Sequence, residues 1–295
     1  MCRWVAYVGD PIPLSTLLID TNNSLLVQSL HSKEKFLPEF MQPHGVVRPN
    51  HGANGDGFGL AWVGADGSIG ELKEAIPAWN SWNLKTVTPH LRSHMFMGHL
   101  RSASGNAIAL ESCHPFVYGK WLFQHNGGVG GFGKLRQKLI SEVRPELYEA
   151  VRGQTDSELL FYLALSKGLE DDPVKGLLGL HQTIERARRE AGSTTPWAGA
   201  ISVSDGTALY VLRTSSRTHI GRHKVEPSPS IYYTRGKADL KTLDGRTFAL
   251  SGDSRIVSSE PVVWPYEASQ WEEFPDFSIG VFLPGEEPEI LPVPL

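Results

Sequence analysis

The order of strand-like and helix-like segments constrains the fold of this chain more than any other feature of its sequence. Short apolar runs that end in Gly or polar residues, as strands do, come first and return later in the chain. They occupy residues 3–8, 58–63, 95–100 and 121–125, and then 200–203, 209–212, 231–234 and 247–250. Strands, then helices, then strands is the order of an α+β fold and not of alternating βαβ units.

Helical periodicity is confined to the middle of the chain. Thr155 and Glu158 have the spacing of a capping box, and an apolar stretch follows them. A second helix is expected from Pro173, which suits a first helical turn, to Gly192, which suits a helix end. The sequence therefore predicts a pair of helices between two groups of strands.

Charge and composition exclude several classes of protein. The chain has 295 residues and a formal net charge of -4, which argues against a broadly basic surface for nucleic acid. Two cysteines cannot build the disulfide framework of a secreted protein. No run approaches the ~20 apolar residues of a membrane-spanning helix, and the first residues lack the order of a signal peptide. We therefore expect a cytoplasmic protein without nucleic-acid or membrane partners.

The last part of the chain differs in composition from the rest. From residue 256 onward there is no Lys or Arg, and proline and acidic residues are frequent. We expect one domain over residues 1–265 and an acidic, Pro-rich extension over 266–295 that packs on the same domain. Residues 31–57 are also irregular, with several Pro and Gly residues, which is typical of a functional lid.

Cys2 is the residue that says most about chemistry. If Met1 is removed, Cys2 carries a thiol and a free α-amine, whose reference pKa of about 7.7–8.0 leaves part of it unprotonated near neutral pH. The amine can then act as general base for the thiol, as in N-terminal-nucleophile catalysis. On position alone, a small buried apolar side chain is the commoner explanation for an early cysteine.

Three later segments supply polar groups that fit this chemistry. Arg101 could grip a carboxylate through two parallel hydrogen bonds, although a surface salt bridge is the simpler explanation. Asn126 and Gly127 could donate hydrogen bonds to an oxyanion, although Asn-Gly is also a common turn. Asp156, at a helix start, could hold an ammonium group, although helix capping is the alternative. Together with Cys2, these groups are what the hydrolysis of a γ-glutamyl amide requires.

The motifs around these residues resemble, in the same order, those of the class II glutamine amidotransferases. They are Cys2-Arg3, Arg101 with Ser104, His125-Asn126-Gly127 and Thr155-Asp156-Ser157-Glu158. Further motifs resemble the branch that contains the amidotransferase-like subunit of the alternative glutathione-degradation pathway. These are Asn54-Gly55-Asp56-Gly57-Phe58-Gly59, Pro77-Ala78-Trp79-Asn80, Cys113-His114-Pro115-Phe116 and Ser259-Glu260-Pro261. The γ-glutamyl hydrolase of ergothioneine biosynthesis is a more distant match.

The resemblance implies a fold and a role for each matching residue. The fold is the N-terminal-nucleophile fold, a four-layer αββα sandwich in which two antiparallel sheets pack face to face. Cys2 would be nucleophile and base, Asn126 and Gly127 the oxyanion hole, Arg101 the partner of the substrate α-carboxylate, and Asp156 the partner of its α-ammonium.

Two positions depart from the family pattern. Ser104 falls where the family often has Thr and is expected to contact the substrate carboxylate, and Gly105 falls where some members have His. The resemblance implies no cofactor. A metal site is not expected either, because the spacing of His31, His44 and His51 matches no zinc pattern.

The leading functional hypothesis is a hydrolase that cleaves a γ-glutamyl amide, either glutamine or a γ-glutamyl conjugate, through a glutamyl thioester on Cys2. A second is a glutaminase subunit that supplies ammonia to a synthase or acts within a hetero-complex; too little chain remains after the nucleophile domain for a fused synthase. A third is a non-catalytic γ-glutamyl-binding module. The expected partners are a small-molecule γ-glutamyl substrate and either a partner subunit or further copies of the chain. The leaving group of the substrate is not specified by these motifs.

Overall fold

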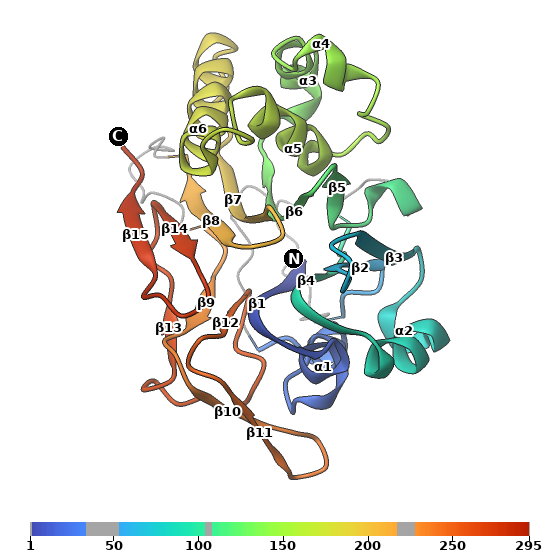
Figure 1. Ribbon diagram of the computed structural model, residues 1–295. Coiled ribbons are helices and arrows are strands. Elements are labelled where there is room, and N and C mark those ends of the chain that lie inside the picture. Colours follow the sequence, from blue (N-terminus) through green and yellow to red (C-terminus); the bar gives the residue numbers. More distant parts are fainter. Residues whose placement is uncertain (1, 34–52, 104–107, 217–227, 295) are drawn as a thin grey trace, which may run out of the picture.

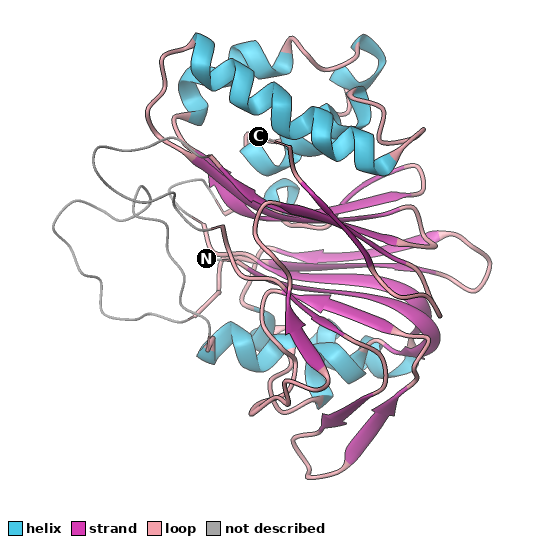
Figure 2. Cartoon of the chain, turned by 90° about the vertical axis from the view of Figure 1, so that its left-hand side faces the viewer, coloured by secondary structure: helices cyan, strands magenta, loops and turns pink. Residues whose placement is uncertain are grey.

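The computed structural model describes residues 2–33, 53–103, 108–216 and 228–294, which form two β-sheets covered by helices. The sheets pack face to face in the middle of the molecule, and helices cover the outer side of each sheet (Figures 1 and 2). The α+β class and the four-layer αββα arrangement expected from the sequence are therefore confirmed.

The first sheet has seven strands in the order β13-β9-β12-β1-β4-β2-β3, all antiparallel. Its members are β1 (Arg3–Pro13), β2 (Phe58–Val63), β3 (Ile69–Glu74), β4 (Arg92–Leu100), β9 (Tyr232–Thr234), β12 (Arg255–Ser258) and β13 (Trp271–Glu273). Arg3 pairs with Leu100, and Leu100 pairs on its other side with Phe58. The start of β1, the end of β4 and the start of β2 therefore lie together at one end of this sheet.

The second sheet has six antiparallel strands in the order β15-β14-β8-β7-β6-β5. They are β5 (Phe116–Tyr118), β6 (Trp121–Val129), β7 (Trp197–Ser204), β8 (Leu209–Ser215), β14 (Ser278–Phe282) and β15 (Glu289–Pro292). A separate hairpin is formed by β10 (Ala238–Lys241) and β11 (Thr247–Leu250). Strands β13, β14 and β15 come from the tail, so residues of the tail belong to both sheets. The domain boundary at residue 265 stays a prediction.

The helices divide between the two outer faces. The first sheet is covered by α1 (Leu25–His31) and α2 (Trp82–Val87), together with a π-helical turn at Thr16–Asp20. The second sheet is covered by α3 (Phe132–Ile140), α4 (Pro145–Tyr148), α5 (Asp156–Ser166) and α6 (Pro173–Glu190). Helix α5 is apolar on all sides because it is enclosed by the sheet and by neighbouring helices, and residues 157–165 are all buried.

Three apolar clusters hold these layers together. One lies between the sheets and includes Trp4 and Met97 from the first sheet and Leu122 and Val211 from the second. The other two lie between each sheet and its helices. Successive residues of a strand point to opposite faces, so β1 feeds both the inter-sheet and the outer cluster. This is why β1 reads as a continuous apolar run.

The two predicted helices are confirmed, with the expected starting residues. The Thr155 hydroxyl accepts a hydrogen bond from the Glu158 N–H, and the Asp172 side chain accepts one from the Lys175 N–H. The confinement of helices to the middle of the chain was a wrong prediction, because α1 and α2 lie in the first third. Their seven and six residues make too few turns for an apolar period to show.

Candidate active site

Cys2 lies at the start of β1, next to the residue that follows β4 on the neighbouring strand. Its side chain is half-buried, and its Sγ accepts a hydrogen bond from the Ser102 N–H at 3.4 Å. The Ser102 carbonyl oxygen is 3.8 Å from the same sulfur. The thiol is therefore held at the end of the sheet, one residue away from Arg101.

Arg101 is buried and braced by the segment 54–59. Its backbone N–H donates to the Gly57 carbonyl at 2.8 Å, and its Nη1 donates to the Asp56 carbonyl at 3.3 Å. The Asp56 carboxylate accepts a hydrogen bond from the Ala103 N–H at 2.8 Å. The Asn-Gly-Asp-Gly motif thus holds the backbone at Arg101 and just after it. Because Arg101 is buried, it is not the arginine of a simple surface salt bridge.

At position 57 of this motif the backbone conformation and a close neighbour both require glycine. The φ of Gly57 is +118°, and a Cβ there would lie 2.7 Å from the Cys113 Sγ. Cys113 is fully buried, and burial raises the pKa of its thiol. The motifs at Gly57 and Cys113 are therefore packed against each other beneath Arg101.

Asn126 and Gly127 lie inside β6 and do not form a turn. They pair with Ala200 and Gly199 of β7, and pairing continues to Val129. The Asn126 side chain is 2% exposed, and its Oδ1 has no hydrogen-bond partner within the described part of the chain. Gly127 has a φ of +149°, where a Cβ would meet the Ala198 carbonyl oxygen at 2.0 Å. The turn interpretation is therefore wrong, and among the described residues the side-chain carbonyl of Asn126 has no partner that explains its burial.

Asp156 is the first residue of α5 and ties this helix to the end of β6. One carboxylate oxygen accepts a hydrogen bond from the Val129 N–H, and the other accepts one from the Ser157 N–H, both at 2.8 Å. The helix cap itself is Thr155, while Glu158 accepts hydrogen bonds from the loop N–H groups of residues 152 and 153. Helix capping therefore does not account for Asp156.

Buried histidines link the two sheets behind these residues. His99, two residues before Arg101, places its Nε2 3.2 Å from the carbonyl oxygen of His125, which precedes Asn126. The His99 and His114 rings stack with centroids 4.1 Å apart. Burial lowers the pKa of His99 to about 3, so its ring is neutral at physiological pH. The end of β4 is thereby joined to the middle of β6.

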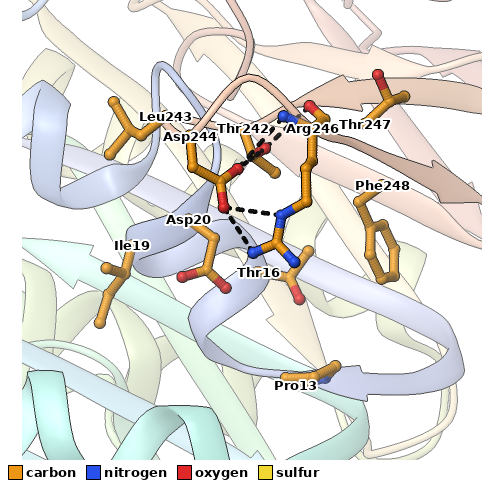
Figure 3. Close-up of a pocket in the computed structure, with 10 residues that line it drawn as sticks. All are labelled: Pro13, Thr16, Ile19, Asp20, Thr242, Leu243, Asp244, Arg246, Thr247 and Phe248. Atoms are coloured by element: carbon orange, nitrogen blue, oxygen red, sulfur yellow. Dashed lines mark hydrogen bonds and ion pairs between the residues drawn. The ribbon is translucent and has the colours of Figure 1, made fainter.

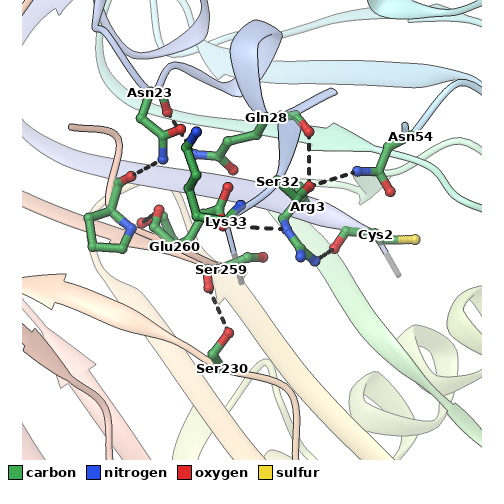
Figure 4. A network of polar contacts seen from close by, with 12 residues as sticks. Cys2, Arg3, Asn23, Gln28, Ser32, Lys33, Asn54, Ser230, Ser259 and Glu260 are labelled. Carbon is green, nitrogen blue, oxygen red and sulfur yellow. Dashed lines mark hydrogen bonds and ion pairs between the residues drawn. The ribbon is translucent and has the colours of Figure 1, made fainter. Parts of the chain in front are cut away.

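A polar network anchors the chain on the other side of Cys2 (Figure 4). The Arg3 Nη1 donates to the Cys2 carbonyl oxygen at 2.8 Å, and its Nε lies 3.9 Å from a carboxylate oxygen of Glu260. That oxygen also accepts a hydrogen bond from the Lys33 N–H at 2.9 Å. Ser259 exchanges two hydrogen bonds with the backbone of Trp4. The Ser-Glu-Pro motif therefore holds the first residues of β1.

Five of the six residues that the sequence singled out lie among the described residues, in two groups that the His99–His125 contact joins. Cys2 and Arg101 lie at one end of the first sheet, Asn126 and Gly127 on the facing strand β6, and Asp156 at the helix joined to β6. Ser104 lies outside the described residues, as do Gly105, His44 and His51. Their roles stay predictions.

Other residues of the region have no function predicted from the sequence. Arg3 and Glu260 belong to motifs that resemble those of the family, but the motifs alone do not say what these two side chains do. Nothing in the sequence indicates a role for Ser157 except that it follows Asp156. Among the described residues, no three His, Cys, Asp or Glu side chains gather as metal ligands would.

A surface hollow lies elsewhere, between the π-helical turn and the β10–β11 hairpin (Figure 3). Its polar residues include Asp20, Asp244 and Arg246, and the Arg246 Nε donates to Asp244 at 2.7 Å. That carboxylate also accepts the Thr242 hydroxyl. Because Asp244 and Arg246 pair with each other and Cys2 is not among the lining residues, this hollow is separate from the candidate site.

Comparison with known proteins gives a family match over most of the chain. A model described as "Glutamine amidotransferases class-II" matches residues 42–290. Separately, within the described residues no helix has both the length and the apolar character needed to cross a membrane.

Individual relatives agree with this match. The chain is 28% identical to "Probable glutamine amidotransferase DUG3" of Saccharomyces cerevisiae over 307 residues, covering 95% of this chain and 81% of the yeast protein. It is 30% identical to "Gamma-glutamyl-hercynylcysteine sulfoxide hydrolase" of Mycolicibacterium smegmatis over 171 residues, 58% of this chain and 65% of that protein. A solved glutamine aminotransferase class-II domain protein from Silicibacter pomeroyi superposes with a TM-score of 0.65 at 29% identity, covering 100% of both chains.

Proposed function

We propose, because this chain belongs to the class II glutamine amidotransferase family, that it hydrolyses a γ-glutamyl amide with Cys2 as its nucleophile. The family match confirms the resemblance predicted from the motifs. The observation that carries the proposal is the hydrogen bond from the Ser102 N–H to the Cys2 Sγ at 3.4 Å. This contact supports a site in which the thiol lies beside a buried arginine. The thiol could then attack the amide of a substrate whose carboxylate the arginine binds.

Acylation is the first step of the proposed reaction. Removal of Met1 leaves the α-amine of Cys2 free to take the thiol proton, and the sulfur attacks the γ-carbonyl carbon. A carbon–sulfur bond forms, and the carbonyl electron pair moves to the oxygen. The Asn126 side-chain N–H and the Gly127 N–H are proposed to stabilise that oxyanion. The carbon–nitrogen bond then breaks, and the leaving amine takes the proton from the α-ammonium.

Deacylation regenerates the thiol. Water attacks the glutamyl thioester while the α-amine of Cys2 accepts one of its protons. The carbon–sulfur bond breaks, glutamate leaves, and the sulfur recovers its proton. One amide and one water molecule thus become glutamate and an amine, with no cofactor involved.

Recognition of the glutamyl half is assigned to two charged residues. Arg101 would bind the α-carboxylate, because a buried guanidinium offers two parallel donors to a carboxylate. Asp156 would bind the α-ammonium, since a half-buried carboxylate has acceptor capacity beyond its two backbone hydrogen bonds. Ser104 remains a proposed second contact to the carboxylate. We keep a cytoplasmic location as part of the proposal, because reducing conditions there preserve a free thiol.

The leaving group distinguishes the two candidate functions. The mycobacterial relative is named as the hydrolase of a γ-glutamyl conjugate, which favours stand-alone hydrolysis. The yeast relative is named as a probable glutamine amidotransferase, which favours a glutaminase subunit that releases ammonia within a hetero-complex. We give preference to hydrolysis of a γ-glutamyl conjugate by the chain itself.

A substrate screen with the purified full chain tests the proposal. After mass analysis has established that Met1 is absent, glutamate release is measured from glutamine, from γ-glutamyl-cysteinylglycine and from a γ-glutamyl thiohistidine-type amine. An α-linked glutamyl dipeptide is the matched control. Release from a γ-linked compound but not from the α-linked control is expected, and the ratio of kcat/KM values identifies the leaving group. No release from any γ-linked compound would contradict hydrolysis by the isolated chain. If glutamine turnover appears only when cell extract is added, the glutaminase subunit is favoured.

A further inference from the structure

A closed ring of polar contacts joins β6 to the start of α5 behind the candidate oxyanion hole. The His125 Nδ1 lies 2.9 Å from the Ser157 Oγ. Ser157 contacts one Asp156 carboxylate oxygen twice, through its N–H at 2.8 Å and its hydroxyl at 3.4 Å. The other Asp156 oxygen returns to β6 by accepting the Val129 N–H at 2.8 Å. The carboxylate is therefore held from the strand and from the helix at once.

The other edge of the His125 ring supports Gly127. A Cβ on Gly127 would lie 2.7 Å from the His125 Nε2, so the imidazole is packed directly against the backbone of this glycine. The backbone of His125 is itself held, because its carbonyl oxygen contacts the His99 Nε2 at 3.2 Å. One buried side chain thus touches both the backbone of the proposed oxyanion hole and the group that orients Asp156.

The His125 ring is neutral and has a polar group at each edge. Burial keeps the pKa of His125 below its usual value, against the opposing effects of Asp156 and of the Ala198 backbone, so the ring carries one N–H. Its Nδ1 meets the Ser157 hydroxyl at 2.9 Å, and the same hydroxyl lies 3.4 Å from the Asp156 carboxylate.

We propose that His125 and Ser157 are positioning residues that hold the Asn126–Gly127 backbone and the Asp156 carboxylate in fixed relation to each other. The proposal rests on the proposed function, since it takes these three residues as the groups that meet the substrate. It assigns the two positioning residues different effects. Ser157 aims a carboxylate that binds the substrate ground state, whereas His125 supports donors that act on the transition state.

Substitution of Ser157 tests the first effect. Ser157→Ala removes the hydroxyl that links His125 to Asp156, and KM is expected to rise about tenfold, as loss of one hydrogen bond to a charged group implies. The kcat should stay within about threefold, and Ser157→Thr, which keeps a hydroxyl, should restore most of the KM. The matched control is Ser166→Ala in the same helix, where the hydroxyl accepts the Arg144 N–H and contacts the Tyr162 carbonyl. This control should lower the melting temperature without changing either kinetic constant.

Substitution of His125 tests the second effect. His125→Asn leaves an amide donor near the former Nδ1 but removes the atoms that pack against Gly127. We expect kcat to fall about tenfold and KM to change little, since only transition-state contacts are disturbed. Should this variant fail to fold, the Ser157 series decides alone.

A spectroscopic measurement separates failure of this proposal from failure of the proposed function. In the full chain with ¹⁵N-labelled histidine, the nitrogen shifts of His125 should show a neutral ring, and Ser157→Ala should move the Nδ1 shift. If the shifts behave so but no γ-glutamyl compound is cleaved, the contact stands and the proposed function is wrong. If substrate is cleaved but Ser157→Ala leaves the Nδ1 shift or KM unchanged, the positioning role is overturned.

Discussion

The guanidinium of Arg3 donates a hydrogen bond to the carbonyl oxygen of Cys2 at 2.8 Å, so the residue after the candidate nucleophile holds its backbone in place. The same guanidinium approaches Glu260, whose side chain is fully buried. Chain ends are usually poorly ordered unless they are tied down. A nucleophile at the second residue therefore depends on contacts of this kind.

Loss of the Glu260 carboxylate should be costly to stability. Glu260→Ala leaves the buried Arg3 without its ion-pair partner, and breaking a buried pair costs about 3–5 kcal/mol. The free energy of unfolding, from urea titration, measures this. The matched control is Glu71→Ala, which breaks the ion pair of Glu71 with Lys73. This pair is more exposed than the Arg3–Glu260 pair, so its loss should cost about 0–1 kcal/mol. Equal losses in the two variants would mean that the Arg3–Glu260 pair does not stabilise the start of β1.

Arg101→Lys should raise KM although the charge is kept. Lysine lacks the planar fork that meets both oxygens of a carboxylate. We expect a loss of about 1–3 kcal/mol in kcat/KM, the range for hydrogen bonds to charged groups. Steady-state kinetics with a γ-glutamyl substrate and with an analogue lacking the α-carboxylate measures the effect. If the variant and the wild type lose equally on removal of the carboxylate, Arg101 does not bind it.

Asn126→Ala should lower kcat by about 10²–10³ with little change in KM, because the amide is expected to meet the oxygen only when it carries negative charge. The fold should survive, since the Asn126 Oδ1 has no partner within the described residues. Asp156→Asn provides the contrast: the ammonium it is proposed to bind does not change during the reaction, so KM should rise instead. Single-turnover acylation and melting temperature are measured on the same preparations. Unchanged acylation in a folded Asn126→Ala protein would exclude Asn126 from the reaction.

The buried histidine pair should make the protein sensitive to acid. Burial lowers the pKa of His99 to about 3 and that of His114 well below its usual value. Between about pH 6.5 and pH 3 the unfolded chain binds protons that the folded chain does not, so stability is complete above this window and is lost as pH falls through it. Each ring contributes a slope of about 1.4 kcal/mol per pH unit.

Urea unfolding between pH 7.5 and pH 5 measures this slope. His114→Phe keeps an aromatic ring stacked on His99 and removes one titrating group. The substitution should break no hydrogen bond, because neither ring nitrogen of His114 has a hydrogen-bond partner among the described residues. The slope of this variant should be smaller by about 1.4 kcal/mol per pH unit. An unaltered slope in His114→Phe would contradict the account.

Much of the fold could be predicted because its signals are local. The predicted strand 58–63 has the bounds of the observed strand, and the Thr155 cap and Pro173 begin α5 and α6 as expected. The short helices α1 and α2 begin at serine caps, Ser24 and Ser81, but each is too short for a periodic apolar face. Strand order could not be predicted, because pairings such as β1 with β12 join residues that are far apart in sequence.

The candidate site shows the same division. Cys2, Arg101 and Asp156 were found from their chemistry and from the family motifs. The support beneath them was not, because it depends on contacts between distant segments, such as Gly57 with Cys113 or His99 with His125. The Asn-Gly pair was open to a turn interpretation for a related reason: only the pairing of β6 with β7 decides that it continues a strand.

The turnover rate of Cys2→Ala, with removal of Met1 verified by mass analysis, is the most direct test of Cys2 as the nucleophile. Alanine keeps the α-amine and removes only the thiol, so every other proposed contact remains. We predict a folded protein whose rate falls by about 10⁴-fold or more, as expected when a nucleophile is lost. A rate within about tenfold of the wild type would contradict Cys2 as the nucleophile.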